Sequence, residues 1–289
     1  MSTTLFYRVL SWNLRTMLRQ WHFLITAIVF GMLGWSSALY VSTFPAPFKK
    51  NIWDAIFVSF AGPGMWGTSI LEMLRWFVPH LLFFYLIGDM AEGELQYRGP
   101  LVIPLVGSRR LWWLGKITTL FILAVGYTVF GIVTTIIGAA IALPWAMDLS
   151  PFLRSGALWT VPDTMNVMAL LAWFVSLISS TLFAISLLQI TLSVWWRRAF
   201  YAFTSISALM LLSWLLGIDN PILVRWLPGS QSMLLRHTIF DSGVPNHSLA
   251  WSLGYNIVIV TVVFWTSIWH VHHVDIWNPT ADIHLKEER

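Results

Sequence analysis

Long apolar stretches constrain this chain more than any other feature of its sequence. Six stretches approach or exceed the roughly 20 apolar residues that a helix needs to cross a lipid bilayer. They cover residues 22–40, 71–87, 117–142, 168–194, 199–216 and 253–269. Only 10% of the 289 residues are charged, which is too few to keep the surface of a soluble domain wet. The sequence therefore predicts one all-α membrane domain, residues 1–289, with six transmembrane helices.

The positions of lysine and arginine predict how these helices are oriented. An even number of spans places both termini on one side of the membrane. Eleven basic residues fall on that side and five on the other, with Arg75 inside a span. Because cytoplasmic loops carry the excess of basic residues, we expect a multi-pass protein of the cell membrane with both termini in the cytoplasm.

Tryptophan is unusually frequent, with 19 copies, and its indole ring favours the membrane–water boundary. Most copies fall near a predicted span end, which is typical of an aromatic belt. These are Trp21, Trp53, Trp112, Trp113, Trp145, Trp195, Trp196, Trp214, Trp251 and Trp269. Trp173 and Trp265 lie deeper within spans and are expected to pack against other helices.

Three segments outside the spans also carry a pattern. Residues 1–21 interleave apolar residues and arginines at helical spacing, which predicts a helix lying on the cytoplasmic face of the membrane. This helix either only anchors the chain or also docks a partner. Residues 218–250 are too apolar for an ordinary loop, so we expect short re-entrant or interfacial helices, broken at Pro228 and Gly229. Residues 44–67 are similar, with Pro45, Pro47 and several glycines around a short apolar stretch, residues 52–60.

The sequence lacks the motifs of most enzymes. It has no cysteine, which excludes thiolate metal sites and cysteine nucleophiles. A phosphate-binding loop needs two glycines five positions apart, followed by Lys and then Ser or Thr. At Gly115–Lys116, Arg110 replaces the first glycine and Ile117 replaces the hydroxyl residue. We therefore expect a chain that is not an enzyme, holds no cofactor of its own and does not bind ATP alone.

Three polar residues near or within the second span need an explanation, because charge in contact with lipid is costly. Glu72 and Ser69 match a capping box at the start of that helix. Arg75 lies one turn further on and is placed to pair with Glu72. His80 follows Pro79, which is expected to kink the helix. The group is either structural or lines a substrate pathway, and the two interpretations are compatible.

Small and hydroxyl residues recur in the third and fourth spans. They favour close packing between helices in lipid, with a polar conduit as the alternative. They are Gly126, Gly131, Thr134, Thr135 and Gly138, followed by Ser176, Ser179, Ser180, Thr181, Ser186 and Gln189.

A cluster of imidazole and carboxylate groups follows the last span. Its members are His270, His272, His273, Asp275 and His284. Interfacial histidines are more often solvated than bound to metal, so no metal site is assigned, although a transition metal is chemically compatible with this set.

The loop between the second and third spans, residues 88–116, has an ordered arrangement of charge. Glu92 and Glu94 come first, and an apolar stretch of helical length follows them. Arg109, Arg110 and Lys116 then lead into the third span. A short amphipathic element held between two spans is able to transmit force from a soluble partner into the membrane.

This loop resembles that of the transmembrane subunits of type-2 ABC exporters. Their loop reads an acidic residue, a Gly-Thr pair, an apolar stretch, then Pro, a small residue, Arg, and Gly-Lys at the start of the third span. Here Glu92-Gly93 or Arg98-Gly99 corresponds to the first part, and Ser108-Arg109 and Gly115-Lys116 to the second. No Thr follows either glycine, and Pro104 stands five residues before Arg109, further than in the family.

The resemblance implies the permease half of an ATP-driven exporter. Such subunits pair as homodimers or heterodimers in the lipid bilayer and form the substrate pathway between them. Each binds a separate ATPase subunit, which holds ATP and Mg, through the N-terminal helix and the loop. The ATPase-coupling residues that follow from this are Glu92, Gly93, Glu94, Leu95, Arg98, Gly99, Leu101, Ile103, Pro104, Arg109, Arg110 and Lys116.

Within this loop we expect Leu95, Leu101 and Ile103 to fill a groove in the partner, and the charges to orient it. Leu101→Asp should therefore uncouple transport more strongly than Glu94→Gln. The alternative function is an ion-gradient-driven secondary transporter, which would need carboxylates near the middle of the membrane. No nucleic acid partner is expected, and the sequence does not select a substrate.

Overall fold

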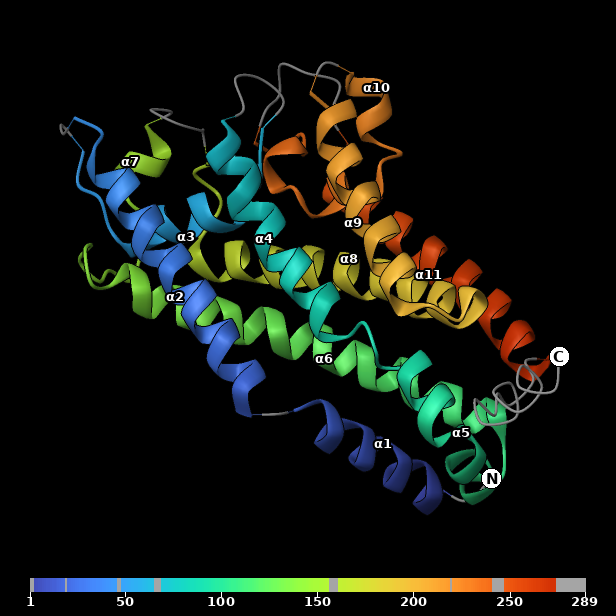
Figure 1. Ribbon diagram of the computed structural model, residues 1–289. Helices are drawn as coiled ribbons and strands as arrows, with labels where there is room; N and C mark the ends of the chain where they lie inside the picture. Colours follow the sequence, from blue (N-terminus) through green and yellow to red (C-terminus); the bar gives the residue numbers. More distant parts are fainter. Residues whose placement is uncertain are drawn as a thin grey trace, which may run out of the picture.

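The computed structural model describes residues 3–18, 20–45, 48–64, 69–155, 161–218, 220–240 and 247–273, without the side chains of 3, 4, 97, 98, 100, 101 and 221. Within these ranges every regular element is helical, apart from an isolated bridge between His237 and His247 (Figure 1). The elements are α1 (Thr3–Met17), α2 (Gln20–Ser42), α3 (Ile52–Phe60), α4 (Ile70–Leu86), α5 (Glu92–Val106), α6 (Arg109–Ala139), α7 (Pro151–Arg154), α8 (Val167–Trp196), α9 (Ala199–Leu216), α10 (Pro221–Val224), the 3-10 helices η1 (Pro228–Ser232) and η2 (Leu234–Arg236), and α11 (Leu249–His273).

Four helices of the described chain, α2, α6, α8 and α11, are long and apolar enough to cross a membrane. This agrees with an all-α, multi-pass membrane protein. Helices also occupy the other two predicted spans, but α4 has 17 residues and α9 has 18. Length and composition therefore support four spans directly and leave the count of six to a geometric argument.

The helices run between two opposite ends of the molecule (Figure 1). At one end, which we call the α5 end, Arg109 Nη1 at the start of α6 donates to His272 O at the end of α11, over 3.1 Å. At the other, the α3 end, Asn51 Nδ2 before α3 donates to Asp148 O after α6, over 2.9 Å. The elements α3, α7, α10, η1 and η2 gather there, whereas α1 and α5 lie at the α5 end.

The closest helix packing joins α2 and α6, where glycine removes the side chain. A Cβ on Gly34 would lie 2.1 Å from Thr135 O, and a Cβ on Gly138 would lie 2.1 Å from Gly31 O. Gly131 likewise faces the ring of Phe30. Small residues let two backbones approach in this way. The packing interpretation of this stripe is thus confirmed at Gly131, Thr135 and Gly138, whereas a Cβ on Gly126 would meet nothing within 4 Å.

Polar side chains join α8 and α6 to α11. Asn256 Nδ2 of α11 donates to Ser180 Oγ and Thr181 Oγ1 of α8, each over 3.0 Å. Trp113 Nε1 of α6 donates to Ser267 Oγ of α11 over 2.8 Å. Part of the hydroxyl stripe in the fourth predicted span is therefore used for helix contacts.

The short helices at the α3 end are built into the core. All nine residues of α3 are buried, and its Asn51–Asp54 capping box is complete. Asp54 also accepts from Ser150 Oγ, and burial raises the pKa of its carboxyl to about 6. The expected break in residues 218–250 is confirmed, because η1 begins at Pro228. Leu235 N then donates to Ala61 O after α3, over 3.0 Å.

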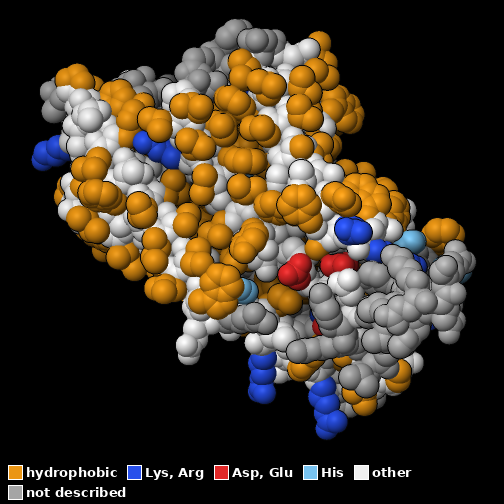
Figure 2. Space-filling model, in the orientation of Figure 1, with side chains coloured by type: hydrophobic (Ala, Val, Ile, Leu, Met, Phe, Trp, Pro, Cys, Tyr) orange, Lys and Arg blue, Asp and Glu red, His pale blue; other side chains and the backbone are white. Residues whose placement is uncertain are grey.

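The tryptophan pattern needs correction at several positions. Trp53, Trp112 and Trp113 are buried, and their ring N–H groups donate to Ala146 O, Glu94 and Ser267. They hold helices together instead of facing a membrane boundary. Conversely, Trp265 was expected to pack inside the protein but is 65% exposed. Apolar side chains cover most of the visible face, and charged ones gather toward the α5 end (Figure 2).

Candidate functional site

Helix α5 forms within the 88–116 loop, begins without a side-chain cap at Ala91 and ends at a glycine C-cap. Glu92 and Glu94 occupy its first turn, where carboxylates favour the positive end of the helix dipole. Gly107 ends it in the left-handed conformation, with φ 71°, and its N–H donates to Ile103 O over 2.9 Å. Ser108 then caps α6, since its Oγ accepts from Leu111 N over 3.4 Å. This tight turn fixes α5 against the start of α6.

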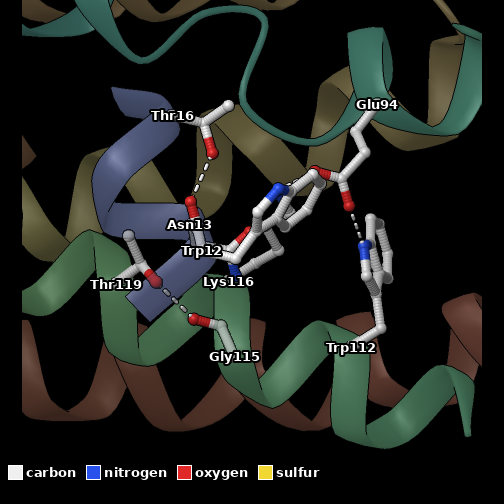
Figure 3. A network of polar contacts seen from close by, with 8 residues as sticks. All are labelled: Trp12, Asn13, Thr16, Glu94, Trp112, Gly115, Lys116 and Thr119. Carbon is white, nitrogen blue, oxygen red and sulfur yellow. Dashed lines mark hydrogen bonds and ion pairs between the residues drawn. The ribbon is translucent and has the colours of Figure 1, made fainter. Parts of the chain in front are cut away.

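A buried polar network joins α1, α5 and α6 (Figure 3). Lys116 Nζ of α6 lies 2.6 Å from Glu94 Oε2 of α5 and donates to Asn13 Oδ1 of α1 over 2.9 Å. Trp112 Nε1 donates to the other Glu94 oxygen. The Lys116 and Glu94 side chains are 1% and 11% exposed. A buried charge requires such a partner. The ion pair therefore holds α5 against α6, and the hydrogen bond to Asn13 adds α1 to the same contact.

Gly115 explains how α1 comes so close to α6. A Cβ at this position would lie 2.7 Å from Val9 Cγ1 and 3.4 Å from Asn13 Nδ2. Val9 and Asn13 are both buried against α6. The N-terminal helix is therefore packed onto the bundle by one face. Gly115 and Lys116 act together: the glycine leaves room for Val9 of α1, and the lysine binds Asn13 of α1 and Glu94 of α5.

A second carboxylate of α5 lies at the start of α9. The Ala199 N–H and the charge of Arg198 both favour the ionised form of Glu92 and lower its pKa. Burial and the neighbouring Asp89 act in the opposite direction and prevail, so the pKa of Glu92 is raised above its ordinary value. Helix α5 thus contacts the α8–α9 turn as well as α6.

The apolar residues of α5 do not all point where the sequence predicted. Ile103 is 9% exposed and Leu95 packs against the core, so neither offers its side chain freely to a groove in a partner. Leu105 is 80% exposed, and Pro104, Gly107 and Arg110 beside it are also exposed.

The remaining predicted coupling residues differ in how far they are accessible to a partner. Gly99 is buried, Gly93 is half-buried, and Arg109 is bound to α11. The side chains of Arg98 and Leu101 lie outside the described set. Sequence reasoning missed Asn13, Trp112 and Leu105. Only the spacing of Asn13 from Val9, one helical turn, hinted that the two share a face.

The polar residues of α4 lie apart from this network, toward the α3 end. Ser69 Oγ accepts from Glu72 N over 3.2 Å, so the predicted cap is present. The Arg75 guanidinium lies 4.6 Å from the ring centre of Tyr40. His80 is buried, and its Nδ1 hydrogen-bonds to Trp76 O over 2.7 Å. Arg75 and His80 border a small cavity of about 20 Å³, which is enough for a water-sized group only.

The histidines after the last predicted span do not form a metal centre in the described part of the chain. His273 Nδ1 hydrogen-bonds to Trp269 O over 2.8 Å, and His270 packs against Trp195. Among described residues, no three His, Asp or Glu side chains are grouped to hold a metal. Asp275 and His284 lie outside the described residues.

Comparisons of the chain with protein-family models, curated proteins and solved structures found no match.

Proposed function

We propose that this chain is the membrane-spanning subunit of an ATP-driven ABC exporter, working as a dimer with separate ATPase subunits. In this proposal the α5 end faces the cytoplasm, and both termini lie there. The ATPase binds the exposed parts of α1 and α5. Movement of that partner is then passed to α6 and exports a substrate across the cell membrane.

The observation that carries this proposal is the buried junction of Lys116, Glu94 and Asn13. It fastens the two elements expected to contact an ATPase, α1 and α5, to the beginning of a 31-residue helix. A displacement of α5 would be transmitted to α6 through the ion pair, and a displacement of α1 through the packed contact at Gly115. Neither depends on a flexible loop. The exposed side chains Arg8, Arg15, Leu105 and Arg110 would form the docking surface.

The path of the chain supports six spans. Helix α2 leads from the α5 end to the α3 end, and α6 begins again at the α5 end, so α4 must return the chain between them. Helix α9 does the same between α8 and α11. At a rise of about 1.5 Å per residue, the 17 residues of α4 cover about 26 Å, close to the roughly 30 Å of a hydrocarbon core.

A secondary transporter is less well supported. Ion-coupled carriers use carboxylates near mid-membrane. The helices α2, α6, α8 and α11 contain no Asp or Glu, and Glu72 stands in the first turn of α4.

Purification of the full chain from its native membrane tests the proposal. An ATPase subunit should co-purify, and the complex should hydrolyse ATP while the chain alone binds none. Leu105→Asp on the α5 surface should reduce recovery of the ATPase. Met147→Asp, a matched change of another 80% exposed apolar residue near the α3 end, should not. Purification of an intact chain without any ATPase, together with transport driven by an ion gradient, would overturn the proposal.

A further inference from the structure

Two adjoining cavities open beside the junction between α1 and α2. The first has a volume of about 280 Å³ and lies among α1, α2, α4 and α6. The second has a volume of about 340 Å³ and lies among the ends of α1 and α4 and the start of α9. Met17, His22 and Leu86 line both, so the two cavities adjoin, and we refer to them together as the cleft. Its size falls in the range of small-molecule sites.

The inner part of this cleft is an apolar chamber. Its wall is formed mainly by the side chains of Leu14, Phe23, Phe83, Ile122, Leu123 and Phe130. The polar side chains on this wall are those of Tyr127, His22 and Thr26. The Tyr127 hydroxyl donates to Pro79 O over 2.6 Å, and His22 Nδ1 hydrogen-bonds to Met17 O over 2.9 Å, so both have partners of their own. Gly126 keeps the chamber open, since a Cβ there would meet nothing within 4 Å. The chamber suits a hydrocarbon or aryl group and offers little to a polar one.

The outer part of the cleft has a different chemistry. Its lining includes four aromatic rings, those of Trp21, Tyr85, Phe200 and Phe203. Three of them are widely exposed, with Trp21 45%, Tyr85 62% and Phe200 71% accessible. Asp89 is exposed beside them and is the only charged side chain among the described residues that line the cleft.

The Asp89 carboxylate is not held in an ion pair within the described part of the chain. No hydrogen bond or ion pair joins its side chain to another described residue. Asp89 raises the pKa of the neighbouring Glu92 and Arg198 lowers it, so two carboxylates lie near one guanidinium at this turn. Figure 2 shows acidic side chains at the edge of the apolar face, with basic side chains beside them. An anion is disfavoured here, and a neutral lipid chain would leave the carboxylate unused.

We propose that this cleft binds an amphipathic monocation, with an alkyl or aryl body in the chamber and an ammonium-type group at the mouth. The cation would contact Asp89 and the faces of Trp21, Tyr85 and Phe200. Aromatic faces attract alkylated ammonium groups, and a nearby carboxylate adds a direct charge interaction. That this ligand is the exported cargo rests on the proposed function, whereas its binding does not.

Binding to the purified full chain tests this inference without an ATPase. The chain is placed in phosphatidylcholine nanodiscs, and radiolabelled hexyl-, octyl- and dodecyltrimethylammonium are titrated, with partition into empty nanodiscs subtracted. We expect saturable binding that tightens with chain length. Dodecyl sulfate should not compete. Asp89→Asn should weaken binding of every member of the series about tenfold or more. Asp148→Asn, an exposed aspartate near the α3 end, should bind like the wild type.

A second variant separates the chamber from the mouth. Gly126→Phe fills the chamber where the backbone leaves open space, so the fold should tolerate it, and an unchanged melting temperature would confirm this. It should flatten the dependence on chain length while leaving the preference for cation over sulfate. Equal binding by Asp89→Asn, competition by dodecyl sulfate, or no saturable binding would each overturn the inference. Saturable cation binding by a chain that recovers no ATPase would overturn the proposed function alone.

Discussion

Lys116 is a charged residue inside the protein, where it needs a balancing charge. Its ammonium group is almost fully buried, and its charge is balanced by Glu94, with further contacts to Asn13 and to the faces of Trp12 and Trp112 at 5.8 Å. Removal of one partner of a buried pair leaves an uncompensated charge, which costs about 3 to 5 kcal/mol. The effect of a change at Glu94 is therefore larger than the sequence alone suggested.

We predict that Glu94→Gln lowers the thermal stability of the chain in detergent markedly and loosens α1. Glu92→Gln, in the same turn of α5, should be close to neutral, because burial already disfavours the ionised form of Glu92. The double variant Glu94→Gln/Lys116→Met should recover much of the loss, since it removes both charges. The measurement is the melting temperature of the wild type, the two single variants and the double variant. Equal values for the Glu94 and Glu92 variants would contradict the assigned role of the ion pair.

The histidine pair at the α3 end predicts acid sensitivity. Burial lowers the pKa of His237 to about 4 and that of His247 to about 3, from 6.5. His237, Arg236 and Arg225 lower the pKa of His247 further, because each opposes a new positive charge. Both rings stay neutral when folded but take up protons when unfolded below about pH 6.5. Their contribution to stability is complete above that pH and is lost as the pH falls toward 4.

We therefore predict that His247→Phe reduces the drop in melting temperature between pH 7.5 and pH 5. Among the residues that the structure describes, the ring nitrogens of His247 have no hydrogen-bond partner. Its ring packs 4.5 Å from that of His237, so phenylalanine keeps this contact and loses no described bond. His237→Phe serves as the contrast. His237 bonds to Met233 O, Leu234 O and Ser252 Oγ, so its loss should destabilise at every pH. A His247→Phe curve parallel to the wild type would rule out this origin of acid sensitivity.

Single residues show where sequence reasoning reaches its limit. The charge order in the 88–116 loop drew attention to Glu94 and Lys116, which the structure joins in an ion pair. However, a helical period does not tell which face of α5 meets the bundle, so Ile103 was assigned to a partner and Leu105 was overlooked. Trp112 and Trp113 were assigned to a boundary because indole favours it, but the same N–H group serves equally well to bond a buried acceptor.

At the scale of elements, the contact of α1 with α6 depends on one missing side chain. We predict that Gly115→Leu displaces α1, because even its Cβ would overlap Val9. Amide hydrogen exchange in residues 3–17 should accelerate, while α2 and α8 remain protected. The matched control is Gly254→Leu on α11, where a Cβ meets nothing within 4 Å. Unchanged exchange in α1 would show that its packing does not rely on Gly115.

The helices themselves were predictable, because an apolar stretch near 20 residues has few alternatives in lipid. All six stretches contain a helix, and α9 has the predicted bounds. Which helices pack against one another was not predictable in the same way. The contacts that define the bundle join residues far apart in the chain, such as Asn13 with Lys116 and Ser180 with Asn256. Helix α3, residues 52–60, lies in the apolar segment 44–67 that the sequence shows, yet nothing local in the sequence shows that all nine of its residues are buried.

At the scale of the whole molecule, the two ends are chemically different, which makes topology the most direct test. We predict that the α5 end is cytoplasmic and that α4 and α9 both cross the membrane. The chain contains no cysteine, so single cysteines give an unambiguous label. Met147→Cys and Ile222→Cys, both at exposed positions near the α3 end, should react with an impermeant maleimide in intact cells. Leu105→Cys and Arg198→Cys should react only after permeabilisation. Lys49→Cys, at an exposed position between α2 and α4, should be labelled in intact cells like Met147→Cys. If α4 did not cross, Lys49→Cys would instead lie on the same side as Leu105→Cys. If α9 did not cross, Ile222→Cys would be protected like Arg198→Cys. Either outcome would exclude six spans, and labelling of Leu105→Cys from outside would also exclude the cytoplasmic position that the ATPase-docking surface requires.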